Sequence, residues 1–125
     1  VTSNWDDRLP NILEKLNIID EVDAVYCSAV GGFEKPHPNA FKRSLAAIDI
    51  TDKNDFKSVV HVGDSDVNDI FGAQNVGIGY AIKWGGDREN ARVTPAFDFQ
   101  ELADEMIASA YAFADDSKTT RRYFF

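Results

Sequence analysis

Three aspartates follow a short apolar run near the middle of the chain. They are Asp64, Asp66 and Asp69, in the stretch VVHVGDSDVND. Like charges at this spacing repel, so a compensating feature is needed. A divalent cation bound by Asp64 and Asp69 would supply it. The alternative is that all three favour the N-terminus of a helix, each by about 0.3–1 kcal/mol. Asp66 is expected to have that role beside Ser65 as a possible N-cap.

A lysine upstream lies in a loop that two prolines stiffen. Lys35 is in EKPHP, where Pro36 and Pro38 restrict the backbone. A fixed ammonium could offset negative charge on a carboxylate nucleophile and a phosphoryl group; the alternative is a lysine that faces solvent. Ser3 and Asn4 stand where an initial strand is expected to end. The Ser3 hydroxyl could donate to a phosphate oxygen, or Ser3 or Asn4 could cap the next helix.

Short apolar runs alternate with helical patterns along the chain. Strands are predicted up to Ser3 and at DAVYCS, SVVHV and IGYAIK; helices are predicted over about 7–17, from Pro38 to Ile48, from Val67 to Gly77 and from Phe99 to Phe113. The stretches AVGGFEKPHP and WGGDRENARVTP are predicted loops. This alternation predicts an α/β fold, with a parallel sheet covered by helices on both faces. Functional sites in such folds lie at the carboxyl ends of the strands, where all the candidates above fall.

The composition is that of an ordinary globular domain. The 125 residues carry a formal net charge of −8, which argues against nucleic acid or an anionic membrane as a partner. The single cysteine, Cys27, excludes an intrachain disulfide and fits an intracellular location, cytoplasmic or nuclear. Residues 1–114 are expected to form the domain, and residues 115–125 a polar and aromatic tail that is poorly ordered. The sequence does not indicate an oligomeric state.

Taken in order, the segments TSNWDDR, GGFEKPHPNAF and HVGDSDVNDIFGAQNVG resemble the motifs of the haloacid dehalogenase-like hydrolase superfamily. Within it, they are most similar to the haloacid dehalogenase-like hydrolase domain-containing protein 3 group. Ser3 matches the second motif, Lys35 the third, and Gly63-Asp64 with Asp69 the acidic fourth. The resemblance implies a three-layer, Rossmann-like parallel sheet. It extends over about residues 1–106.

The resemblance also implies a function, a Mg²⁺-dependent phosphatase that acts on a small phosphorylated metabolite through an aspartyl-phosphate. Ser3 and Lys35 would then be catalytic and, with Asn4, bind the substrate, while Asp64 and Asp69 would bind the metal. Two alternatives stay open. One is a 2-haloacid dehalogenase that uses no metal, and the other is a non-catalytic binding or regulatory domain on the same scaffold.

One motif of the superfamily is not matched. The first motif is Asp-x-Asp-x followed by Thr or Val. Asp64-Ser65-Asp66 does not match it, because Asn68 takes the position of the Thr or Val. The nucleophile is therefore expected upstream of Ser3, on a strand that lies in the middle of the sheet beside SVVHV. Without that strand, the sheet is expected to be incomplete. The helical cap domain that commonly gives substrate specificity in the superfamily is expected to be missing as well. The chain alone is expected to be inactive and marginally stable, with unpaired strand edges.

Overall fold

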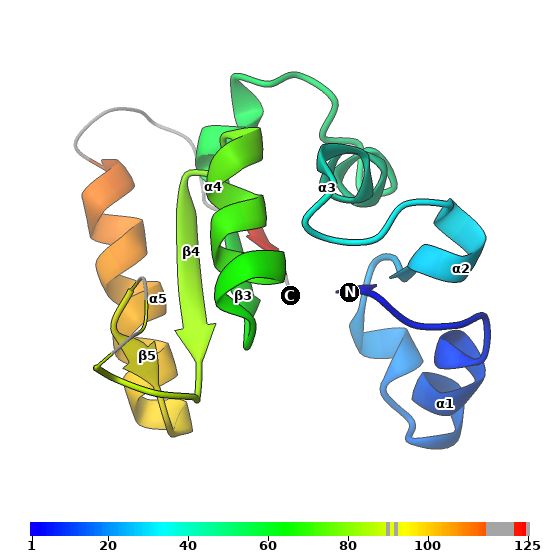
Figure 1. The fold of residues 1–125 in the computed structure, drawn as a ribbon, viewed down its shortest axis with the longest axis horizontal. Helices are drawn as coiled ribbons and strands as arrows, with labels where there is room; N and C mark the ends of the chain where they lie inside the picture. The colour runs from blue at the N-terminus through cyan, green and yellow to red at the C-terminus, as the bar shows by residue number, and fades with distance from the viewer. Residues whose placement is uncertain (90, 92, 115–121, 125) are drawn as a thin grey trace.

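The computed structural model describes residues 1–89, 91, 93–114 and 122–124 (Figure 1). Its strands form two sheets, one of β1 and β2 and one in the order β5-β4-β3-β6, and every strand pair is parallel. The predicted α/β class with a parallel sheet is confirmed. The sheet is incomplete as predicted, because no backbone pairing joins the two sheets within the described residues.

The first sheet brings the beginning of the chain beside a strand 24 positions further on. β1 (Thr2–Ser3) pairs with β2 (Tyr26–Cys27), with Ser3 opposite Cys27. Between them lie α1 (Leu9–Lys15) and the 3₁₀ turn η1 (Ile19–Glu21), and after them α2 (Ser28–Gly31) and α3 (Pro38–Ala46). Pro38 opens α3 as predicted, since proline lacks the N–H that a first helical turn leaves unused.

The second sheet carries the acidic segment. After the 3₁₀ turn η2 (Asp55–Ser58) come β3 (Val59–Gly63), the π-helix η3 (Asp66–Phe71), α4 (Gly72–Val76), β4 (Tyr80–Trp84), β5 (Pro95–Ala96), α5 (Phe99–Ala114) and β6 (Arg122–Phe124). Figure 1 shows α4 and α5 on opposite sides of β4. The helices therefore cover both faces of this sheet, as the alternation of elements predicts.

The main core lies where α3 meets β3 and α4. Its buried members are apolar side chains from these elements and their connections: Phe41, Leu45, Ile50, Phe56, Val59, Ala73 and Ile78. Gly72 makes this contact possible, because a Cβ there would lie 2.7 Å from the Phe41 ring and 3.1 Å from the Pro36 Cα. The same packing holds the loop that carries Lys35 against the start of α4.

The segment after β3 is helical as predicted, but its first part is the π-helix η3 and not an α-helix. Ile70 N–H donates to the Ser65 carbonyl at 3.1 Å, a bond that spans five residues and widens the turn. Ile70 is buried, but Val67 and Phe71 are 56% and 41% exposed, so the three do not share one buried face. The helical spacing of these three residues assumes 3.6 residues per turn, which the wider π-helical turn does not have.

Two other predictions of secondary structure need correction. Part of the predicted loop AVGGFEKPHP is the short helix α2, and the predicted loop before residue 96 ends in the strand β5. The two unpredicted elements, α2 and β5, are short and lie at the ends of predicted loops. The last helix begins at Phe99 as predicted, and the side chain of Phe99 is exposed.

The end of the chain pairs with β3. β6 lies parallel to it, with Val59 opposite Arg122 and His61 opposite Phe124. These three residues form a strand because the edge of β3 offers backbone groups that an extended segment can satisfy. The poor order expected of the tail as a whole stays a prediction. The rest of the predicted tail, residues 115–121 and 125, lies outside the described residues. Within the described part of the chain, no helix has the length and apolar character to cross a membrane.

Candidate active site

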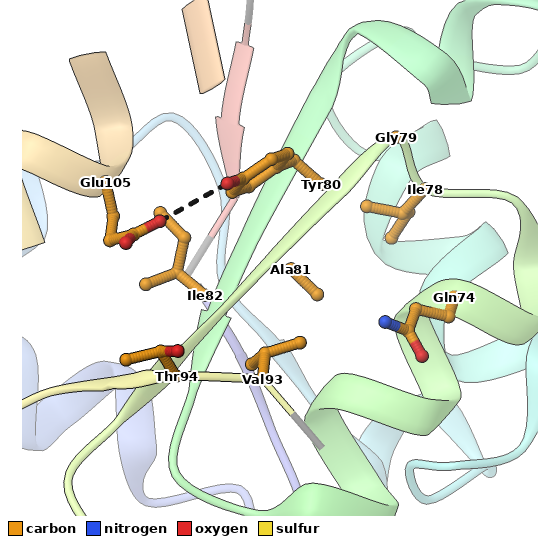
Figure 2. Close-up of a pocket in the computed structure, with 9 residues that line it drawn as sticks. All are labelled: Gln74, Ile78, Gly79, Tyr80, Ala81, Ile82, Val93, Thr94 and Glu105. Carbon is orange, nitrogen blue, oxygen red and sulfur yellow. Dashed lines mark hydrogen bonds between the residues drawn. The ribbon is translucent and has the colours of Figure 1, made fainter. Parts of the chain in front are cut away.

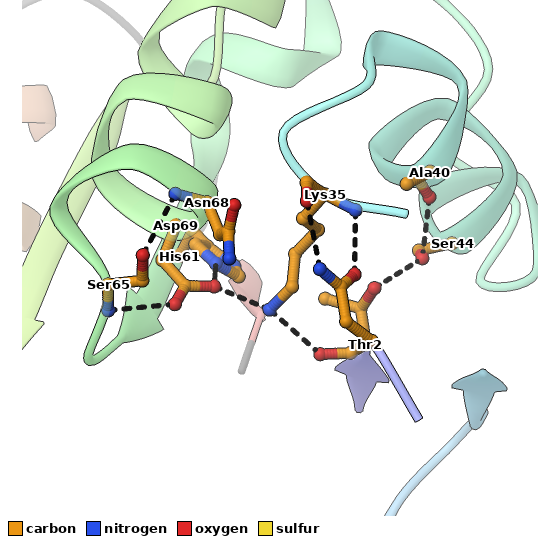
Figure 3. Close-up of polar contacts among 9 residues, drawn as sticks. Thr2, Lys35, Ala40, Ser44, His61, Ser65, Asn68 and Asp69 are labelled. Atoms are coloured by element: carbon orange, nitrogen blue, oxygen red, sulfur yellow. Dashed lines mark hydrogen bonds and ion pairs between the residues drawn. The ribbon is translucent and has the colours of Figure 1, made fainter. Parts of the chain in front are cut away.

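Asp69 lies at the centre of a polar cluster between the two sheets (Figure 3). Its side chain is 5% exposed. Oδ1 forms an ion pair with Lys35 Nζ and lies 3.0 Å from His61 Nε2, while Oδ2 accepts the Ser65 N–H at 3.0 Å. Both carboxylate oxygens are thus engaged by groups of the chain itself.

The environment of Asp69 holds its carboxyl group in the ionised form. Burial by itself raises the pKa of Asp69, because it penalises the charged state. The hydrogen bonds from His61 and Lys35, the charge of Lys35 and the Ser65 N–H outweigh burial and hold this pKa well below its usual range. Asp69 is therefore a carboxylate at neutral pH, and its charge fixes the ammonium of Lys35.

Lys35 is held at both ends. Its side chain is 11% exposed, and Nζ donates to the Thr2 carbonyl at 3.2 Å as well as to Asp69. The Asn4 side chain binds the backbone of Lys35 twice: Oδ1 accepts the Lys35 N–H at 2.6 Å, and Nδ2 donates to the Lys35 carbonyl at 2.8 Å. The alternative of a lysine that faces solvent is wrong, and the ammonium lies beside the end of β1.

Gly63 allows Asp69 to approach the sheet. Gly63 is the last residue of β3, and a Cβ at this position would lie 2.6 Å from Asp69 Oδ2. Any larger residue would push the carboxylate away. The glycine before Asp64 thus has a steric role in the site, in addition to ending the strand.

His61 is a part of the cluster that the sequence interpretation missed. It is fully buried in β3, its Nε2 faces Asp69, and its ring packs edge-on against Phe41 at 5.3 Å between centroids. The available signal was a titratable residue inside the apolar run SVVHV. Because alternate residues of a strand share a face, His61 and Gly63 both point toward Asp69.

The predicted residues of the first strand lie close to this cluster. Ser3 is half-buried at the end of β1, and the preceding Thr2 supplies the carbonyl that Lys35 binds. The hydroxyls of Thr2 and Ser44 are hydrogen-bonded at 2.9 Å, which ties β1 to α3. The alternative in which Ser3 or Asn4 caps the next helix is wrong, since the N-cap of α1 is Arg8.

The other two aspartates have different surroundings. Asp66 Oδ2 accepts from Lys83 Nζ at 2.8 Å, so Asp66 does more than favour a helix start. Ser65 is the N-cap as predicted, and its Oγ accepts the Asn68 N–H. Asp64 is exposed, and its carboxylate forms no hydrogen bond or ion pair with the residues that the structure describes.

These surroundings test how well the site fits a metal ion. The described residues contain no group of three acidic, histidine or cysteine side chains placed to bind one. Asp64 fits as one ligand, since its oxygens are unengaged and face solvent. Asp69 as a direct ligand stays a prediction, because its oxygens already accept hydrogen bonds. A complete metal site would need ligands besides these.

Two of the cavities on the described surface differ in their relation to the site. One of about 590 Å³ adjoins the site and is lined by Asn4, Trp5 and Glu34, among others. The other, of about 350 Å³, lies at the start of β4 and contains none of the predicted site residues (Figure 2). There the Tyr80 hydroxyl donates to Glu105 at 3.3 Å. Of these two, the first is the one that contains a predicted site residue, Asn4, whose side chain is bound to the Lys35 backbone.

The fold agrees with the comparisons to known proteins. The sequence profile of the family "Haloacid dehalogenase-like hydrolase" matches residues 1–83, and the chain belongs to this family. It is also similar in fold to a solved structure, the crystal structure of HAD phosphatase from Thermococcus onnurineus. The TM-score is 0.61 and the identity 21%, over 82% of this chain and 46% of that one.

Curated relatives fall into two named groups. Glyceraldehyde 3-phosphate phosphatase of Pyrococcus abyssi is 39% identical over 64 residues, which is 51% of this chain and 25% of the relative. Haloacid dehalogenase-like hydrolase domain-containing protein 3 of Danio rerio is 31% identical over 110 residues, which is 86% of this chain and 43% of the relative. The predicted resemblance to the latter group is confirmed. The chain spans less than half the length of these relatives.

Proposed function

We propose that this chain carries part of the active site of a phosphatase that acts on a small phosphorylated metabolite. The observation that carries the proposal is the fixed ammonium of Lys35, held between the Thr2 carbonyl and Asp69 beside the end of β1. A buried, oriented cation at the carboxyl ends of parallel strands suits the negative charge of a phosphoryl group. The adjoining cavity offers room for the rest of the substrate.

Each predicted residue has a distinct role in this proposal. Ser3 donates its hydroxyl to a phosphoryl oxygen, and Lys35 offsets the charge on the nucleophile and on the phosphoryl group. Asn4 positions Lys35, because its amide is bound to the Lys35 backbone. Asp69 keeps the ammonium in place.

The proposed reaction passes through an aspartyl-phosphate, whose nucleophile is an aspartate that this sequence does not supply. The chain's own Asp-x-Asp does not fit, because Asp66 is paired with Lys83. Asp64 would hold a Mg²⁺ ion together with ligands from outside this sequence. The ion would stabilise the charge that develops on the phosphoryl oxygens.

The test is an assay of the full-length protein against a panel of phosphomonoesters. We expect release of inorganic phosphate that a chelator abolishes and added Mg²⁺ restores. Release of halide from 2-haloacids without metal would replace this proposal with the dehalogenase alternative. Absence of both activities in a folded protein would favour a non-catalytic binding domain.

The 125-residue chain by itself is expected to be inactive and marginally stable. β1 pairs only with β2 among the described residues, and the join between the sheets depends on side chains. A sharp, cooperative thermal transition of the monomeric chain would contradict this expectation. The division after residue 114 and the intracellular location stay predictions; Cys27 is a buried free thiol, which is compatible with that location.

A further inference from the structure

A second buried lysine lies at the carboxyl end of the sheet. Lys83 is in β4, directly opposite Gly63 of β3. Its side chain is 5% exposed, and Nζ lies 2.8 Å from Asp66 Oδ2. Gly86, with φ of +92°, passes over the lysine stem, and a Cβ there would lie 3.2 Å from Lys83 Cε. The backbone at Gly86 therefore lies close to the end of the Lys83 side chain, whose ammonium is paired with Asp66.

The two lysines pair with two of the three aspartates of the acidic segment, and the third carboxylate has no such partner among the described residues. Lys35 pairs with Asp69 from one side, and Lys83 pairs with Asp66 from the other. Within the part of the chain that the structure describes, Asp64 is the member of the three whose carboxylate has neither a hydrogen bond nor an ion pair. The repulsion among the aspartates is therefore offset by two lysines, and one carboxylate stays open.

We propose that Lys83 is a positioning residue that keeps Asp66 away from the bound cation and leaves Asp64 as the carboxylate of this loop that binds it. The inference rests on the proposed function, which places a divalent cation at Asp64. Asp66 lies two residues from Asp64 and carries the same oxygen ligands, so without Lys83 it would compete for the cation. Pairing with a buried ammonium removes that competition and lowers the negative charge near the ion.

The experiment measures binding of Mn²⁺ alone to the full-length protein by isothermal titration calorimetry, without substrate. Lys83→Met keeps the apolar stem and removes the charge, and we expect the affinity for Mn²⁺ to rise about threefold or more. Asp66→Asn leaves the lysine charge uncompensated, so the affinity should fall by a similar factor. The double variant Asp66→Asn/Lys83→Met should return to within about twofold of the wild type.

A charge-matched control separates this effect from net charge. Lys53→Met removes an exposed lysine in the connector that precedes β3, at the amino end of the strand. It should leave the Mn²⁺ affinity unchanged. Rescue in the double variant is the outcome that a merely structural role of Lys83 would not produce.

The possible failures are distinguishable. In one outcome, the wild type binds Mn²⁺ while Lys83→Met and Asp66→Asn leave the affinity unchanged. That result overturns the inference and leaves the proposed function standing. A wild-type protein that binds no divalent cation overturns the metal-dependent function itself. If Lys83→Met does not fold, Asp66→Asn and the double variant, which buries no unpaired charge, still decide the question.

Discussion

The ion pair between Lys35 and Asp69 joins the two sheets of this protein. Lys35 follows β2 and binds the Thr2 carbonyl of β1, while Asp69 lies after β3 and binds the Ser65 backbone. No strand pairing connects the sheets among the described residues. The group proposed to act on the phosphoryl group is therefore also a structural link, so stability and activity are coupled at this contact.

Replacing Lys35 should be costly for stability as well as for activity. Lys35→Met leaves the Asp69 carboxylate buried without its main counter-charge, and we expect a loss of about 3 kcal/mol in the free energy of unfolding. Urea denaturation of the full-length protein measures it. Lys42→Met, on the exposed side of α3, is the matched control and should change little. Adding Asp69→Asn to Lys35→Met should cost less than Asp69→Asn alone; equal costs would show that the two side chains are not coupled.

A methyl group at Gly63 should displace Asp69. Because the added Cβ would lie 2.6 Å from Asp69 Oδ2, Gly63→Ala is expected to destabilise the protein by about 1–3 kcal/mol and to lower phosphatase activity. Gly77→Ala is the comparison. Gly77 has φ of +92° with open space around it, so alanine there costs about 1–2 kcal/mol of backbone strain and should leave specific activity intact. Full activity of Gly63→Ala would argue against the position assigned to Asp69.

Asp64 and Asp69 should respond differently to the same change. Asp64→Asn alters an exposed carboxylate, so the free energy of unfolding should stay within about 0.5 kcal/mol of the wild type. Its Mg²⁺-dependent kcat/KM should nevertheless fall by at least about tenfold. Asp69→Asn should lower both quantities, because Asp69 is buried and engaged by three partners. Wild-type metal dependence in Asp64→Asn would remove Asp64 from the site.

Low pH should lower the free energy of unfolding, because it protonates the buried Asp69 carboxylate. The pKa of this carboxyl group is lower in the folded state than its unfolded value, which is about 3.9. Its stabilising contribution is then complete at pH values above the unfolded pKa and is lost as pH falls below about 4 toward the folded pKa. Urea denaturation between about pH 5 and pH 2 should show a steeper loss of stability for the wild type than for Asp69→Asn. Asp64→Asn should keep the wild-type slope, and identical slopes for all three proteins would refute this assignment.

Local sequence patterns determined much of the fold. The apolar run before Gly63 predicted β3, Pro38 predicted the start of α3, and Gly77 predicted the end of the helical region after Asp64. These features depend on neighbours along the chain, namely strand propensity, a fixed proline φ and a left-handed glycine. The rule that sites lie at the carboxyl ends of strands grouped Ser3, Lys35 and the acidic segment, and in the structure Lys35 binds both the Thr2 carbonyl, next to Ser3, and Asp69.

The partners of Lys35, Lys83 and His61 at the site were decided by the tertiary structure alone. The sequence could not assign Lys35 to Asp69, Lys83 to Asp66, or His61 to the same cluster, because these pairs form across strands and loops that are distant in sequence. Which side chains pair depends on their distance and burial in three dimensions, and the spacing of residues along the chain does not determine either. Crowded aspartates indicate only that compensating charge is required. The packed fold decides whether a lysine or a bound cation supplies it, because only there do the separate segments come within bonding distance.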